Sequence, residues 1–250
     1  MHLGNGAITL ECAVVTTGLA AAGLAASALA IYRERPRPAK IGQAVACGCL
    51  LFAAQAVNLP IAAGTSAHLV GGVLAAWLLG PALGSWVMAF VLAVQALALG
   101  DGGMMALGAN FINMAVVAVA MCEIVKRVGS RGDAWNAALA ALFSIPLGAV
   151  LIVGETAAFR HAAELMGWTT FANLMLGTHL VIGVVEGVAT AGIVALVCAR
   201  EFGAMRRPAL LTAACAVALI AALALPISSE LPDGYEAAAA ASGLDWLLTP

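Results

Sequence analysis

The first two residues and a distant histidine could together bind a transition metal. The α-amine of Met1, the backbone nitrogen of His2 and the imidazole of His2 can close two consecutive chelate rings on one ion, and His68 can supply a fourth nitrogen. Four nitrogens in a plane, one of them a deprotonated amide, suit Ni(II), Co(II) or Cu(II) better than Mg(II) or tetrahedral Zn(II). The pattern predicts a metal site made of Met1, His2 and His68. An inert surface histidine at position 2 is the alternative.

Other polar residues could support such a site or serve a purely structural purpose. Asp101 either caps a helix or anchors a loop beside the metal site, together with Asn110. His179 and Glu186 are seven residues apart, so they share one face of a predicted helix. They either form a buried hydrogen-bonded pair or act in gating or metal passage.

These residues have to be positioned by elements that lie in a membrane. The chain has 250 residues, of which 63% are hydrophobic and 10% charged, and its mean hydropathy is +1.03. Soluble domains carry roughly 45–50% apolar and about 25% charged residues, so this composition excludes a soluble globular enzyme. The apolar runs are about twenty residues long and lack the roughly ten-residue alternation of barrel strands. We therefore predict an all-α integral membrane protein in the lipid bilayer, with no nucleic acid as a partner.

Charges and turn residues divide the chain into eight apolar runs, which predict about seven to eight transmembrane helices. Lys and Arg collect in cytoplasmic loops, so they give the orientation. If every run crosses once, including the short run 69–79, ten of the eleven Lys and Arg residues lie on one side and only Arg160 on the other. Both termini are then outside. The eight runs are 7–31, 41–59, 69–79, 83–99, 104–125, 135–157, 171–199 and 209–226.

Several stretches resemble the cobalt/nickel substrate-binding (S) component of energy-coupling factor (ECF) transporters, the CbiM/NikM family. The resemblance covers roughly residues 1–200. The opening departs from the family's common Met-His-Ile-Pro-Asp-Gly, because Leu3-Gly4-Asn5-Gly6 follows His2. The stretches that carry the resemblance are Met1-His2, Gly64-Thr65-Ser66-Ala67-His68-Leu69-Val70-Gly71-Gly72, Gln95-Ala96-Leu97, Gly100-Asp101-Gly102-Gly103, 107–114 and His179-x6-Glu186-Gly187.

The resemblance implies an S component that captures Ni(II) or Co(II) as its substrate at the outer face of a bacterial or archaeal plasma membrane. Its N-terminus would be inserted inward, and Met1, His2 and His68 would be the metal ligands. It would work with a transmembrane coupling (T) subunit of the CbiQ/NikQ type and with cytoplasmic ABC ATPases of the CbiO/NikO type. The residues expected to orient the ligands are Thr65, Ser66, Asp101 and Asn110.

The resemblance also divides the chain into two parts. Residues 1–205 would form the metal-binding membrane domain, and residues 206–250 an additional transmembrane helix with an acidic outer tail. The segment Pro232-Asp233-Gly234 resembles the small accessory subunit of the CbiN/NikN type, here fused to the S component. We expect the acidic residues of this tail to be solvated; they are Glu230, Asp233, Glu236 and Asp245.

The chain is predicted to be a transport subunit and not an enzyme. It contains no G-x-x-x-x-G-K-[ST] phosphate loop, so we expect no nucleotide to be bound by this chain and ATP to be hydrolysed by partner subunits. The alternative is a stand-alone secondary carrier or channel for divalent metal ions. Its candidates for ion coupling are Glu11, Glu123, Glu155 and Glu186.

Overall fold

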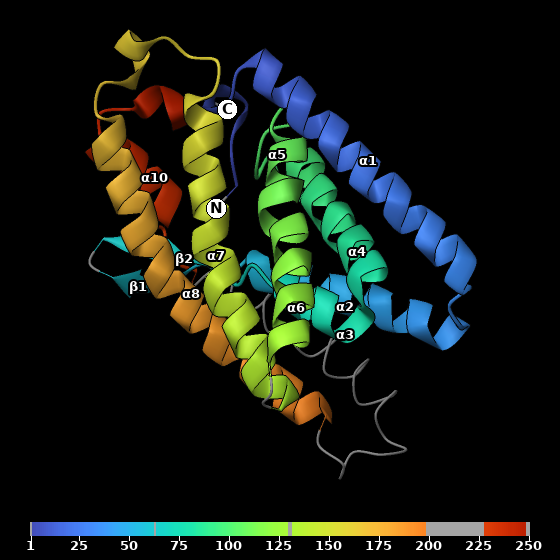
Figure 1. Cartoon of the computed structure of the whole chain (residues 1–250). Coiled ribbons are helices and arrows are strands. Elements are labelled where there is room, and N and C mark those ends of the chain that lie inside the picture. The colour runs from blue at the N-terminus through green and yellow to red at the C-terminus, as the bar shows by residue number, and fades with distance from the viewer. Residues whose placement is uncertain (1, 63, 130–131, 199–227, 249–250) are drawn as a thin grey trace.

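A computed structural model describes residues 2–62, 64–129, 132–198 and 228–248 of the chain, and these residues form a helical bundle (Figure 1). Five described helices are long and apolar enough to span a membrane. The prediction of a multi-pass, helical membrane protein is confirmed. The five are α1 (Leu10–Glu34), α4 (Pro81–Val94, continued to Leu99 by a π-helical turn), α5 (Leu107–Phe111) joined by another π-helical turn to α6 (Val117–Val128), α7 (Asp133–Ala157), and α8 (Trp168–Cys198).

The segment between α1 and α4 differs most from the predicted runs. It contains α2 (Pro38–Gln55), an antiparallel hairpin of β1 (Leu59–Ala62) and β2 (Thr65–Ala67), and α3 (Gly72–Leu79). With eight residues, α3 is roughly 12 Å long, and this is too short to cross about 30 Å of hydrocarbon. The first three residues of the predicted run 69–79 form a loop, and only the remaining eight are helical. This run therefore does not cross the membrane by itself. Neither α2 nor α3 is among the five spanning helices.

The eighth predicted run, 209–226, lies outside the described residues, as does the boundary predicted at residue 205. The described part thus accounts for five of the predicted crossings. The two-stranded hairpin is the one exception to the all-α prediction among the described residues.

The described basic residues separate toward the two ends of the bundle; Arg131, Arg200, Arg206 and Arg207, which belong to the same prediction, lie outside the described residues. In Figure 1, α1, α6 and α8 end toward the lower end of the molecule, and α7 runs in the opposite direction. The last turns of α1 and α6 carry Arg33, Lys126 and Arg127, whereas Arg160 follows the end of α7. Since Lys and Arg mark the cytoplasmic side, the lower end of the view is the inner end.

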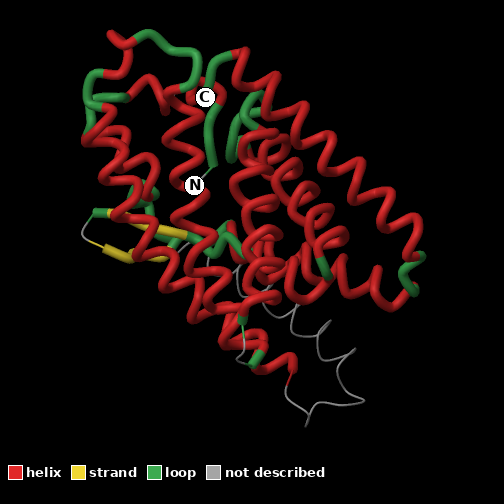
Figure 2. Tube along the Cα trace, in the orientation of Figure 1, coloured by secondary structure: helices red, strands yellow, loops and turns green. Residues whose placement is uncertain are grey.

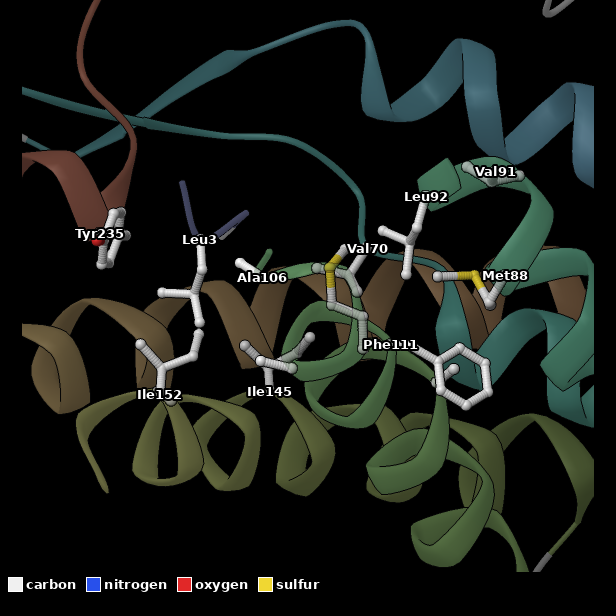
Figure 3. Close-up of a cluster of buried hydrophobic side chains, with 14 of the residues drawn as sticks. Leu3, Val70, Met88, Val91, Leu92, Ala106, Phe111, Ile145, Ile152 and Tyr235 are labelled. Atoms are coloured by element: carbon white, nitrogen blue, oxygen red, sulfur yellow. The ribbon is translucent and has the colours of Figure 1, made fainter. Parts of the chain in front are cut away.

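The N-terminal segment lies inside the bundle. Figures 1 and 2 show it as an extended stretch that runs from the start of α1 down beside α7. Leu3 is fully buried, and its side chain points toward Ile152 of α7 in the apolar core (Figure 3). Burial of a leucine side chain contributes roughly 1.5–3 kcal/mol, and this holds the neighbouring His2 inside as well.

The C-terminal segment packs against the outer half of α8. Its helix α10 (Gly234–Ala241) begins with a capping box, in which Asp233 accepts from the backbone of Tyr235 and Glu236. The Tyr235 ring meets Phe171 of α8 edge to face, with ring centroids 6.0 Å apart, and its hydroxyl donates to the carbonyl of Leu247. Backbone hydrogen bonds from Ser229 to Asn58 and from Ser66 to Pro232 place the start of this segment beside the hairpin, and its last turn, 245–248, lies beside residues 5–7.

Candidate metal site

The backbone of the N-terminal segment is fixed by the loop before α5 and by α5 itself. The backbone nitrogen of Leu3 donates to Asn110 Oδ1 at 2.8 Å, and Asn110 Nδ2 donates back to the Leu3 carbonyl at 3.1 Å. Gly103 N also donates to this carbonyl, at 2.8 Å. A Cβ on Gly103 would overlap the backbone of Asn5, so this close approach requires glycine.

His2 and His68 come together although they are far apart in the sequence. Their imidazole rings are stacked, with centroids 5.1 Å apart and planes inclined by 15°. His2 Nδ1 lies 2.9 Å from Asp101 Oδ1, so the carboxylate sets the orientation of the ring. His2 Nε2 is buried and has no hydrogen-bond partner among the described residues. A buried nitrogen without a partner costs free energy unless something binds there.

His68 lies in the loop between β2 and α3, and the following residues are held from two sides. Gln55 Nε2 of α2 donates to the Val70 carbonyl at 2.6 Å. The two carboxylate oxygens of Glu186 on α8 accept from Val70 N at 2.9 Å and from Gly71 N at 2.6 Å. The loop that presents His68 is therefore built by α2 and α8 together.

The C-terminal segment forms one wall of the site. The predicted site residue Ser66 of β2 binds this segment: its backbone nitrogen donates to the Pro232 carbonyl at 2.9 Å, and its hydroxyl donates to the Leu231 carbonyl at 2.7 Å. Asp233 consequently lines a small cavity together with His68. The expectation that the acidic tail is solvated is wrong for Asp233, because strand-like pairing with β2 draws it inward.

His179 also lines this cavity, but the predicted pair with Glu186 does not form in the described structure. His179 is 1% exposed, and its Nδ1 hydrogen-bonds the Met175 carbonyl one helical turn earlier at 2.7 Å. Glu186 binds the loop after His68 instead. Each of the two buried groups thus has a partner of its own.

The electrostatic setting keeps the His68 ring neutral. Burial is the largest cause that lowers the pKa of His68, to about 3, and the charge of the neighbouring His2 lowers it further. Burial raises the pKa of Asp101, but the hydrogen bond and the charge of His2 outweigh burial, so the pKa falls below its usual value. A neutral His68 imidazole can bind a cation, and the ionised Asp101 carboxylate can hold the neighbouring His2 ring in place.

The remaining predicted residues are placed as follows. Met1 lies outside the described residues. Thr65 is in β2, where its hydroxyl has no hydrogen-bond partner among the described residues. No group of three His, Cys, Asp or Glu side chains in the described ranges could hold a metal ion.

Sequence reasoning missed the supporting role of Gln55, the target of Glu186, and the inward position of Asp233. A polar residue near the end of an apolar run, as Gln55 is, signals a buried function, but the sequence does not show which group it reaches. The short motif Pro232-Asp233-Gly234 was the one feature of the sequence that drew attention to Asp233.

Comparisons with known proteins show what the chain is similar to. A sequence model of the family described as the cobalt uptake substrate-specific transmembrane region, CbiM, matches residues 2–204. A protein of Haloquadratum walsbyi named as a metal transport protein is 42% identical over 147 residues, which are 57% of this chain and 65% of that protein. One of Archaeoglobus fulgidus named as a fused nickel transport protein NikMN is 38% identical over 204 residues, 80% of this chain and 66% of that protein. The aligned parts are thus slightly less than two thirds of both relatives.

A solved structure shares the fold. The crystal structure of a truncated transition metal transporter superposes with a TM-score of 0.69 and 27% sequence identity, over 78% of this chain and 96% of that one.

Proposed function

The chain belongs to the CbiM family, and we propose that it is the membrane subunit that captures Ni(II) or Co(II) for an ATP-driven importer. The observation that carries the proposal is the meeting of two imidazoles from distant parts of the chain, one of them on the buried residue that follows Met1. Names of relatives that refer to nickel transport support the choice of substrate.

The proposed ligands are the amine of Met1, the backbone nitrogen and imidazole of His2, and the imidazole of His68. Such a set of four nitrogens suits Ni(II) and Co(II). The inserted N-terminal segment supports it, because Asn110 and Gly103 fix Leu3 and thereby the backbone next to the chelate. Binding displaces protons from the amine and the amide, so we expect affinity to fall as the pH falls.

Asp101 determines which ring nitrogen of His2 is available to the metal ion. Only Nδ1 closes a six-membered chelate ring with the His2 backbone nitrogen, and Nδ1 is the atom that faces Asp101 here. We propose that the ring turns when metal binds, so that Nδ1 reaches the ion and Nε2 takes over the partnership with the carboxylate. Metal-binding histidines commonly donate their other ring nitrogen to a carboxylate, which also strengthens the ligand.

Import would proceed with partner subunits. The N-terminal segment enters the bundle from the end opposite the Lys and Arg residues of α1 and α6, so the metal would enter from outside. A T subunit of the CbiQ/NikQ type and ABC ATPases of the CbiO/NikO type would then drive the opening of the site to the inside. Release requires that the N-terminal segment and His68 move apart, because this breaks the chelate.

The test is Ni(II) binding to the purified chain with its natural N-terminus. His68→Ala should weaken binding about tenfold or more and change the absorption spectrum of the bound metal. His161→Ala is the matched control, because His161 is exposed on the outer loop and should leave both unchanged. Unchanged affinity and spectrum in His68→Ala would refute the ligand set. Metal uptake by the isolated chain in vesicles without ATP would favour a secondary carrier instead.

A further inference from the structure

The loop that follows His68 is bound at its end by one carboxylate, that of Glu186. Val70 and Gly71 are the last two residues before α3, and their backbone N–H groups converge on the two oxygens of Glu186. Glu186 thus supplies the negative partner at the start of α3, where unpaired N–H groups favour an anion. The carboxylate comes from α8, 115 residues further along the chain.

The chain needs glycine at position 71. Its φ of +73° favours glycine where the loop turns into α3, and a Cβ here would overlap Leu51 of α2. Gln55 holds the Val70 carbonyl at the same time. With both sides of the Val70 peptide bonded, the backbone two residues after His68 has no room to shift unless α8 or α2 moves.

We propose that Glu186 is a positioning residue for the metal ligand His68: it clamps the ligand loop to α8 and so sets the imidazole against His2. The inference rests on the metal site proposed above. Because α8 carries both this clamp and His179 in the wall of the His68 cavity, a displacement of α8 would carry the His68 loop with it.

The experiment measures Ni(II) affinity and the absorption spectrum of the bound metal in the full chain with its natural N-terminus. Glu186→Gln replaces one acceptor oxygen by an NH2 group that faces a backbone N–H, so we expect affinity to fall about tenfold or more, as for other residues that orient metal ligands. Glu155→Gln is the matched control. Glu155 is a half-buried carboxylate of α7 that accepts from Asn113 at 2.7 Å, and this variant should stay within about twofold of the original chain.

A double-mutant cycle separates positioning from a general loss of structure. If Glu186 acts through His68, the double variant His68→Ala, Glu186→Gln binds no more weakly than His68→Ala alone. Original affinity and spectrum in Glu186→Gln, or losses that add in the double variant, would overturn the clamp. If Glu186→Gln does not fold, Glu186→Asp in the same cycle gives the same two readings. Unchanged binding in His68→Ala would overturn the metal site itself and the clamp with it.

Discussion

At the scale of residues, the account depends on the charge that Asp101 places beside His2. The carboxylate lies 2.9 Å from His2 Nδ1, and the histidine helps to keep the pKa of Asp101 below its usual value. Asp101→Asn removes the charge while it keeps the shape, so the imidazole becomes a poorer ligand, and we expect Ni(II) affinity to fall by roughly 10–100-fold. Titration with Ni(II) checks this, with Asp133→Asn as the control at the exposed start of α7. Equal affinity of the two variants would show that Asp101 does not orient the ring.

At the scale of elements, the extended N-terminal segment is held in the bundle by a side chain of α5. This side chain forms the backbone hydrogen bonds that a neighbouring strand would form in a sheet. Asn110 is 2% exposed and satisfies both the N–H and the carbonyl of Leu3. Asn110→Ala leaves the buried Leu3 N–H without this partner, which costs about 1–3 kcal/mol, whereas the Leu3 carbonyl keeps its hydrogen bond from Gly103 N. We expect a lower melting temperature in detergent and weaker Ni(II) binding together. A variant that melts like the original chain, yet binds Ni(II) weakly, would contradict this structural role of Asn110.

At the scale of the whole molecule, the C-terminal segment is part of the folded bundle and closes one side of the site. Tyr235 is 2% exposed and anchors this segment between Phe171 and the Leu247 carbonyl. Tyr235→Ala removes the aromatic anchor, and truncation of a large buried aromatic residue costs roughly 3–5 kcal/mol. We expect faster proteolysis within residues 228–248, whereas Tyr235→Phe loses only the hydrogen bond and should be cleaved nearly as slowly as the original chain. Equal cleavage rates in all three proteins would mean that Tyr235 does not hold the segment.

The sequence predicts the features of this molecule that follow from the thickness of the membrane. Apolar runs of spanning length became α1, α4, α5 with α6, α7 and α8, because a backbone in lipid has to form helices. The hairpin was not predictable, since small residues between 62 and 68 carry little strand preference. The chemistry of the first two residues indicated a site with His68, and the structure brings His2 and His68 together.

The supporting contacts could not be predicted for a different reason. Spacing along a helix suggested that Glu186 pairs with His179, but the carboxylate binds backbone N–H groups that carry no sequence signature. Likewise, Asp233 is drawn inward by backbone hydrogen bonds between Ser66 and the segment before it. Contacts of this kind depend on the tertiary arrangement, and a single sequence does not encode them locally.

The central claim is that the free α-amine is one of the metal ligands. Its most direct test compares Ni(II) binding to the chain that begins at Met1 with binding to the same chain extended by Gly-Ser before Met1. The extension converts the amine into an amide nitrogen in the middle of a longer segment, in a space where Leu3 and His2 are already buried. We predict that the extended chain folds but loses tight binding and the spectrum of the bound metal. Equal affinity and an identical spectrum in the two proteins would contradict the account.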